Sequence, residues 1–208
     1  MAPPEQARTR LARAAVIDAA RTLFVERGYA ATTIEAISDE AGVPQPTLYR
    51  LFTSKLGVLK SLLDVSIAGD DEAVPLPQRA VVREVFEQPD PSRRIEGFAS
   101  VVTQINARVG PLYRVLSSAS TADPEAATLL HDLARQRREG QLGLVRSLAP
   151  SLRAGLTPHI AADVVHAIAS PEVHHLLVVE RGWKPDRYRR WLSDTLGAQL
   201  LSTETATR

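Results

Sequence analysis

The residues best suited to recognise another molecule lie in one short stretch, Thr32–Lys55, which reads TTIEAISDEAGVPQPTLYRLFTSK. The stretch combines an amide, hydroxyls, a phenol and cations, groups that pair with base edges and phosphate oxygens when a short helix presents them. No HExxH sequence, phosphate-binding loop, dinucleotide-binding glycine pattern or nucleophile elbow occurs in the chain. We therefore expect a binding protein with no catalytic residue, no metal and no cofactor.

The elements around this stretch are predicted to be helices. Arg8–Arg27 has apolar residues at the spacing of one helical face, and Gly28 follows where a helix C-terminus favours glycine. A capping box of Thr32 and Glu35 is expected to start a helix that runs to Ala41 and ends at Gly42. The face of the first helix consists of Val16, Ala19, Ala20, Leu23 and Phe24.

The third and fourth helices complete the N-terminal domain. The third is predicted over Gln45–Leu51, anchored by Leu48 and Phe52 at i, i+4 spacing. The fourth begins after Ser54 as its cap and runs to Ala68. Glycine, acids and prolines over residues 69–77 then mark a boundary. We predict a helix-turn-helix domain over residues 1–55, a connecting helix over 54–68 and an effector-binding and dimerisation domain over 69–208.

The second domain is also predicted to be helical, because its prolines fall where helices begin and no strand-like alternation is present. The fold class is therefore all-α. Pro171 should kink or restart one helix, with Ser170 as the cap. The predicted helices cover residues 78–88, 91–109, 111–120, 124–148, 158–181 and 185–201.

The last two of these helices are predicted to form an interface with a second copy of the chain. The helix over residues 158–181 has apolar residues on more than one face, so it must be buried on more than one side. Aromatic residues near the C-terminus fit an interface as well. The predicted dimer contacts are Val173, Leu176, Leu177, Trp191, Leu192, Thr195 and Leu196.

Composition narrows the class of protein further. The 208 residues include no cysteine, which excludes disulfides and thiolate metal sites and fits a reducing compartment. No run approaches the roughly 20 apolar residues of a membrane span, so we expect a cytoplasmic protein. The net charge is only +1, so any attraction to nucleic acid must come from a local patch of cations.

Residues 16–55 resemble the TetR family of bacterial transcriptional repressors. The shared pattern is an apolar helix ending in Leu-Phe, a glycine followed by an aromatic residue, paired threonines, Ala-Gly-Val, Leu-Tyr, and a phenylalanine three residues before a lysine. This chain matches it at Leu23, Phe24, Gly28, Tyr29, Thr32, Thr33, Ile37, Ala41, Gly42, Val43, Thr47, Leu48, Tyr49, Phe52 and Lys55. The segments PLYRVLSSASTADPEAATLL and SPEVHHLLVVERGW look like the regulatory domain of some members.

The resemblance implies a homodimer that binds a palindromic operator and releases it when a small-molecule effector binds. Gln45, Pro46 and Thr47 would face base edges. The predicted phosphate contacts are Thr33, Tyr49, Arg50 and Lys55. The chain departs from the family pattern at Glu35, where many members carry a basic residue, and at Pro44, where a serine cap is common.

Other interpretations of the same residues remain open. One alternative is that Thr32–Lys55 is a helix pair that merely packs, and another is that the second domain belongs to an all-α enzyme or binding protein. Activation of transcription is an alternative to repression. His159, Asp163 and His166 share a helical face that could form part of a metal site, but a polar lining is the better interpretation.

An effector cavity between helices is predicted from the few aromatic residues of the second domain and their apolar neighbours. For any single member, a place in the hydrophobic core is the alternative. The predicted lining is Phe86, Phe98, Val102, Ile105, Tyr113, Leu116 and His166.

Overall fold

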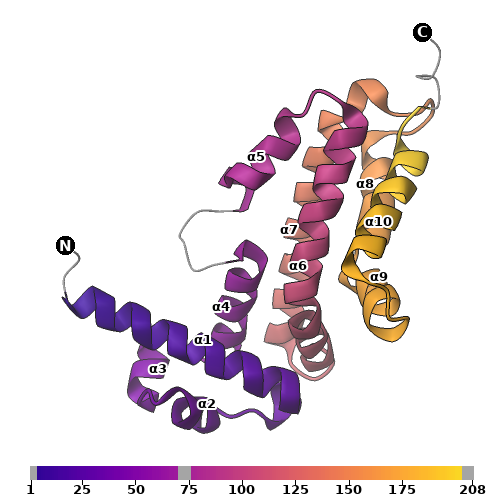
Figure 1. Cartoon of the computed structure of the whole chain (residues 1–208). Helices are drawn as coiled ribbons and strands as arrows, with labels where there is room; N and C mark the ends of the chain where they lie inside the picture. Colours follow the sequence, from indigo (N-terminus) through magenta and orange to yellow (C-terminus); the bar gives the residue numbers. More distant parts are fainter. Residues whose placement is uncertain (1–3, 70–75, 203–208) are drawn as a thin grey trace. The chain divides into compact units, whose positions relative to one another are not determined.

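A computed structural model describes residues 4–69 and 76–202 of the chain, and within these residues the fold is all-α, as predicted (Figure 1). A single β-bridge joins Leu152 and Leu201. The N-terminal helices are α1 (Pro4–Ala31), α2 (Ile34–Ala41), α3 (Gln45–Phe52) and α4 (Lys55–Ala68). After them come η1 (Leu76–Gln78), α5 (Ala80–Glu87), α6 (Pro91–Ala119), α7 (Pro124–Ser147), η2 (Ala149–Ser151), α8 (Pro158–Ile168), α9 (Pro171–His174), the π-helical segment η3 (His175–Glu180) and α10 (Pro185–Leu200).

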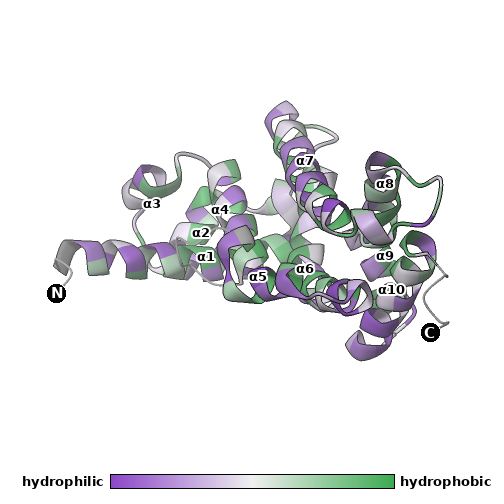
Figure 2. Cartoon of the chain, turned by 90° about the horizontal axis from the view of Figure 1, so that it is seen from above, coloured by the Kyte–Doolittle hydropathy of each residue, from purple (hydrophilic) through white to green (hydrophobic). Residues whose placement is uncertain are grey.

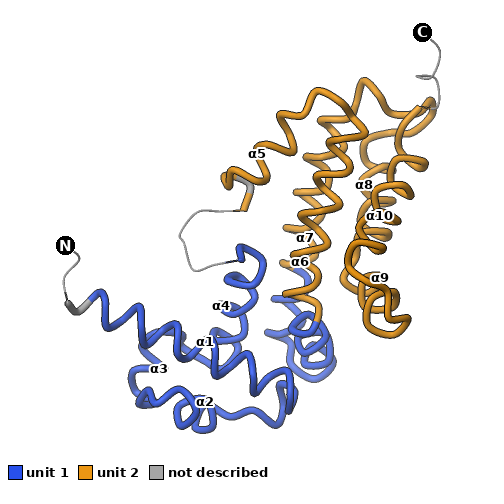
Figure 3. Tube along the Cα trace, viewed as in Figure 1, with its two compact units in different colours: residues 1–70, 111–131 blue, residues 71–110, 132–208 orange. Residues whose placement is uncertain are grey.

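The chain forms two compact units (Figure 3). One unit combines residues 1–70 with residues 111–131, and the other holds residues 71–110 and 132–208. Helices α6 and α7 each contribute to both. The predicted domain boundary at residues 69–77 lies largely outside the described residues, and it stays a prediction.

The core of the first unit follows the periodicity of its sequence. Along α1 the ribbon alternates between hydrophilic and hydrophobic residues (Figure 2), and the apolar positions of that helix are buried. Gly28 has φ of +77°, a value that favours glycine and that turns the chain out of the helix. The buried core residues of the four N-terminal helices are Val16, Ile17, Ala19, Ala20, Leu23, Phe24, Ile37, Leu48, Phe52, Val58, Leu59, Leu62 and Leu63.

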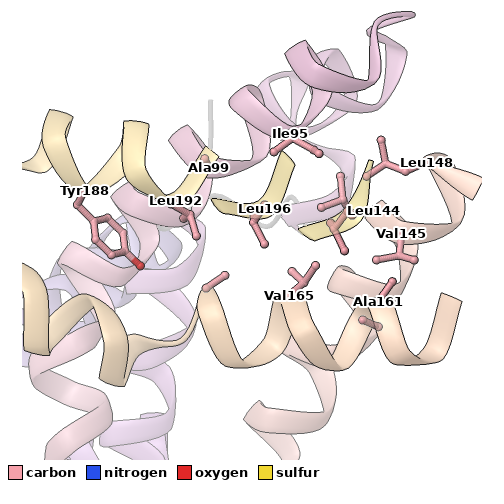
Figure 4. Packing of buried hydrophobic residues seen from close by; sticks show 13 residues of the cluster. Ile95, Ala99, Leu144, Val145, Leu148, Ala161, Val165, Tyr188, Leu192 and Leu196 are labelled. Atoms are coloured by element: carbon pink, nitrogen blue, oxygen red, sulfur yellow. The ribbon is translucent and has the colours of Figure 1, made fainter. Parts of the chain in front are cut away.

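The core of the second unit is a cluster supplied by α6, α7, α8 and α10 (Figure 4). Tyr188, Leu192 and Leu196 of α10 are fully buried in it, and Leu196 lies opposite Val165 of α8. The partly buried Phe98 packs against the same cluster. These contacts between α8 and α10 bury apolar area that would otherwise face water, which is the main force holding the two helices together.

Two predicted helix breaks have different outcomes. The restart at Pro171 is confirmed, because Ser170 Oγ accepts from Val173 N (3.2 Å) and caps α9. Asn106 Nδ2 of α6 donates to the carbonyls of Ala169 (3.2 Å) and Ser170 (3.4 Å), which satisfies buried acceptors at the break.

The break predicted between residues 109 and 111 is wrong, because α6 continues through Pro111. A proline inside a helix removes one hydrogen bond. The flanking turns of α6 nevertheless bury Val109, Leu112 and Leu116, and this burial favours the continuous helix. No helix within residues 4–69 and 76–202 has both the length and the hydropathy of a membrane span.

Candidate nucleic-acid interface

The short helix α3 separates an anchored face from an exposed one. Leu48 and Phe52 are 0% and 5% exposed and fix the helix in the core of its unit. The carbonyl of Pro44 accepts from Thr47 N (2.9 Å), which starts the helix without a side-chain cap. The side chains on the other face, predicted to meet DNA, are all accessible to some degree: Gln45, Pro46, Tyr49 and Arg50 are exposed and Thr47 is half-buried.

The start of α2 differs from the predicted capping box by one residue. Thr33, and not Thr32, is the N-cap, and its Oγ1 accepts from Ala36 N (3.1 Å). Thr32 is fully buried, and its hydroxyl lies between the carbonyls of Gly28 (2.8 Å) and Leu23 (3.1 Å). The prediction was wrong because two adjacent threonines both fit the cap, and only burial distinguishes them.

This correction has consequences for two exposed side chains at the start of α2. The Thr33 hydroxyl accepts with its oxygen, so its proton is available to donate to a phosphate. Glu35, in the first turn of α2, is exposed and is not the carboxylate of a capping box with Thr32.

Lys55, predicted to bind phosphate, makes two hydrogen bonds inside the protein. Its Nζ donates to the carbonyls of Tyr29 (2.8 Å) and Thr32 (2.9 Å) and lies 4.2 Å from the centroid of the Tyr29 ring. An ammonium has one further N–H, so a phosphate contact by Lys55 stays a prediction.

The turn between α3 and α4 places Lys55. Thr53 has φ of +68° and ψ of −43°, and Ser54 N donates to the Phe52 carbonyl (2.7 Å), which makes a γ-turn. Ser54 Oγ then caps α4 by accepting from Gly57 N (3.0 Å). A Cβ on Gly57 would lie 1.9 Å from the Phe52 carbonyl oxygen, so only glycine allows this close approach of α4 to the end of α3.

The cations of α1 divide into internal and accessible ones. Arg13 lies over the Phe52 ring (5.0 Å to its centroid) and donates to Ser61 Oγ (3.1 Å), so it holds α1 against the other helices. Arg8 and Arg10 are exposed. With Arg50 they are accessible cations of this unit that could supply the local positive charge expected from composition.

Comparison with known proteins shows what the N-terminal part of the chain resembles. Residues 16–62 match the model of the bacterial regulatory proteins of the tetR family. This segment is thus similar to the N-terminal part of tetR-family regulators. The transcriptional repressor KstR2 of Rhodococcus jostii is 43% identical over 51 residues, covering 24% of this chain and 25% of that protein. The transcriptional activator FasR of Mycolicibacterium smegmatis is 39% identical over 66 residues, covering 30% of each.

This chain thus spans only about a quarter to three-tenths of the length of these two curated relatives. The whole fold is similar to that of NalD, the secondary repressor of the MexAB-OprM multidrug efflux pump in Pseudomonas aeruginosa. That likeness has a TM-score of 0.71 at 21% identity and covers 94% of this chain and 98% of NalD. It shows that this chain shares the fold of NalD over nearly its whole length.

The residues predicted to line an effector cavity are spread over both units. Tyr113 and Leu116 lie in residues 111–131, where Leu116 is fully buried. In the other unit, Phe98 and Val102 pack against the hydrophobic cluster and Phe86 is 37% exposed. Ile105 and His166 are half-buried. The lining stays a prediction.

The residues predicted to form a dimer interface divide by exposure. Leu192 and Leu196 are fully buried within one protomer and cannot contact a second, so their assignment was wrong. Leu176 is 45% exposed, and Val179 and Ile160, which were not predicted, are 62% and 52% exposed. The other predicted interface residues, Val173, Leu177, Trp191 and Thr195, are half-buried.

A polar network that the sequence did not reveal joins α7 to α8. Arg137 Nη2 lies 3.0 Å from His166 Nε2, and His166 Nδ1 lies 2.8 Å from Gln141 Oε1. Arginine can only donate, so Nε2 is the acceptor and Nδ1 carries the proton, which makes His166 neutral. Among the described residues, no three acids or histidines are grouped to hold a metal ion.

Proposed function

We propose that the chain is a ligand-responsive transcriptional regulator, a repressor, that binds a palindromic DNA operator as a homodimer. The observation that carries the proposal is α3, whose inner face is locked by Leu48 and Phe52 while its outer face offers hydrogen-bonding groups to solvent. A structural helix pair that merely packs has no need of such a face. A bacterial regulator of this kind acts on DNA in the cytoplasm.

The exposed face divides into base-reading and phosphate-binding groups. Gln45 can pair bidentately with adenine, and Pro46 and Thr47 offer apolar contact to a thymine methyl. The hydroxyls of Thr33 and Tyr49 and the Arg50 guanidinium suit phosphate oxygens, which fix the register of the protein on the duplex.

Dimerisation would pair two such faces. The exposed apolar side chains of α8 and η3, Ile160, Leu176 and Val179, supply a surface that a second copy can cover. In a two-fold dimer the two α3 helices enter successive major grooves when they lie one DNA turn, roughly 34 Å, apart.

The effector would act by stabilising a dimer in which this spacing is lost. Helix α4 would carry the change, because it follows α3 directly and ends at Gly69 just before the second unit. The predicted cavity residues of α5–α8 would bind a small molecule.

The alternatives need different observations. Activation of transcription is supported by the activator FasR among the relatives, and the way the operator overlaps its promoter would decide between the two outcomes. An all-α enzyme or binding protein with an unused helix-turn-helix would need a polar catalytic cluster in the second unit.

The test is binding to a duplex selected from random sequence by the full-length protein. The double variant Gln45→Ala, Thr47→Ala should lose about tenfold to a hundredfold in affinity for the selected duplex, since each good base contact discriminates by about 1–3 kcal/mol. Its affinity for unrelated DNA and its circular dichroism should not change. Gln136→Ala, at an exposed position of α7, is the matched control.

The absence of any salt-sensitive, sequence-specific binding by the wild-type protein at low ionic strength would contradict the proposal. An unchanged preference for the selected duplex in the double variant would contradict the assignment of Gln45 and Thr47 to base reading.

A further inference from the structure

The junction between α1 and α2 is held by two side chains of the first unit, Lys55 and Thr32. Lys55, the first residue of α4, donates from Nζ to the carbonyls of Tyr29 (2.8 Å) and Thr32 (2.9 Å). The Thr32 hydroxyl lies within hydrogen-bonding distance of the carbonyls of Gly28 and Leu23. Both side chains therefore bind backbone carbonyls of the second half of α1 and of the residue that follows it.

The same ammonium is packed against an aromatic pair. Nζ lies 4.2 Å from the centroid of the Tyr29 ring, and that ring stacks on Phe24 of the core with centroids 5.8 Å apart. A cation over an aromatic face gains electrostatic stabilisation that water does not provide. The Lys55 side chain is thus fixed from both the backbone and the ring.

The ammonium of Lys55 is partly withdrawn from water. Burial lowers the pKa of Lys55, and the negative charge of Asp123, in the same unit, opposes this shift. Moving the ammonium out to a phosphate would break two part-buried hydrogen bonds to backbone carbonyls, which costs free energy; the Tyr29 carbonyl would keep only its longer bond from Thr32 N (3.4 Å).

The junction fixed in this way lies next to a proposed phosphate contact. Thr32, whose carbonyl Lys55 binds, directly precedes Thr33, the N-cap of α2. The γ-turn at Thr53 fixes the other end, because it sets Lys55 a short distance along the chain from Phe52 of α3. Lys55 is therefore the link between the start of α2 and the end of α3.

We propose that Lys55 supports operator binding as a positioning residue, which holds Thr33 and the start of α2 in place relative to α3, and does not itself neutralise a phosphate. The proposal rests on the proposed function, since it assumes that the protein binds DNA.

The salt dependence of binding separates the two roles. A lost phosphate contact reduces the slope of log affinity against log salt by about 0.9. Loss of positioning leaves the number of neutralised phosphates unchanged. We expect Lys55→Met to bind the selected duplex about tenfold or more weakly than wild type, with the same salt slope. Arg50→Met is the matched control, in which the slope should fall by about 0.9.

The second variant is Lys55→Arg. It keeps the positive charge but replaces the compact ammonium, with its three N–H donors, by a planar guanidinium. The positioning role predicts weaker binding with an unchanged slope for this variant also, and it remains informative if Lys55→Met does not fold. Circular dichroism at the assay temperature confirms that each variant is folded.

Three results would overturn the proposal. These are a slope reduced by about 0.9 in Lys55→Met, wild-type affinity in Lys55→Arg, or wild-type affinity in a folded Lys55→Met. Failure of the proposed function is seen separately, because then the wild-type protein itself shows no specific binding.

Discussion

At the scale of single residues, the first unit depends on a position where no side chain fits. Gly57 lies in the first turn of α4, and a Cβ there would lie 1.9 Å from the carbonyl oxygen of Phe52 and 3.0 Å from its carbonyl carbon. These are backbone atoms, so rotation of a side chain cannot relieve the overlap. The close approach of α4 to the end of α3 is therefore a property of the glycine itself.

We expect Gly57→Ala to lower the free energy of unfolding by about 2 kcal/mol or more, because overpacking against backbone forces α3 and α4 apart. Urea denaturation followed by circular dichroism measures it. In the control Gly140→Ala, an exposed position of α7 with no atom within 4 Å of the added Cβ, stability should rise by about 0.5–1 kcal/mol. Equal stabilities of wild type and Gly57→Ala would contradict the geometry of the turn.

The residue scale also shows what sequence patterns cannot decide. Thr32 and Thr33 are chemically identical candidates for one cap, and only the burial of Thr32 under α1 assigns the role to Thr33. A lysine at the end of a helix-turn-helix suggests a contact with a DNA phosphate. The acceptors of Lys55 are instead the carbonyls of Tyr29 and Thr32, which lie 26 and 23 residues away in the chain.

At the scale of elements, α7 and α8 are joined by a network that requires a neutral histidine. Burial lowers the pKa of His166, and the positive charge of Arg137 lowers it further. Arg138 acts in the same direction, whereas Glu172 and Asp163 oppose the shift. Protonation of His166 would remove the acceptor of the Arg137 hydrogen bond and place two cations 3.0 Å apart.

We therefore expect stability to fall as the pH drops below the unfolded-state value of 6.5 for a histidine, because the unfolded chain then binds a proton that folded His166 resists. The loss continues until the pH reaches the lower folded-state pKa. Thermal unfolding in His166→Gln, whose amide can also accept from Arg137, should depend less on pH in this range.

His174 also contributes to the pH dependence of stability, and this contribution is the same in the wild-type protein and in His166→Gln. Burial, and then the neighbouring His175, lower the pKa of His174 in the same direction, so part of the acid sensitivity should persist in His166→Gln. An identical pH dependence in wild type and variant would show that His166 is not the neutral partner of Arg137.

Element boundaries were predictable where the signal is local. Ser170 followed by Pro171 is a cap and a first-turn proline, and the chain restarts there. Gly110 followed by Pro111 looks equally local, but the buried neighbours of Pro111 hold α6 together. The apolar stripe of α10 was recognised, yet periodicity does not tell whether Leu192 faces its own protomer or another one.

At the scale of the whole molecule, the proposed dimer makes a prediction about exposed apolar side chains. Leu176 and Val179 are 45% and 62% exposed in one protomer. Covering them would remove apolar area from water, and a carboxylate at either position would be buried without a partner.

The variant Leu176→Glu, Val179→Glu should sediment as a monomer at concentrations where the wild-type protein is a dimer. Val81→Glu is the matched control, because Val81 is 50% exposed on α5 and is not part of the proposed interface. Dimers in both variants would place the interface elsewhere, and a monomeric wild type would contradict the dimer itself.

The γ-turn at Thr53 has a mechanical consequence for such a regulator. Only Thr53 and Ser54 separate α3 from α4, one held at a positive φ and the other engaged as a helix cap. A long, flexible loop in this place would absorb a small rotation of α4. This connection is too short and too constrained to absorb the rotation, so in the proposed mechanism a rotation of α4 also moves α3. The shortness of the turn thus determines how far α3 is displaced on the DNA when effector binding moves α4.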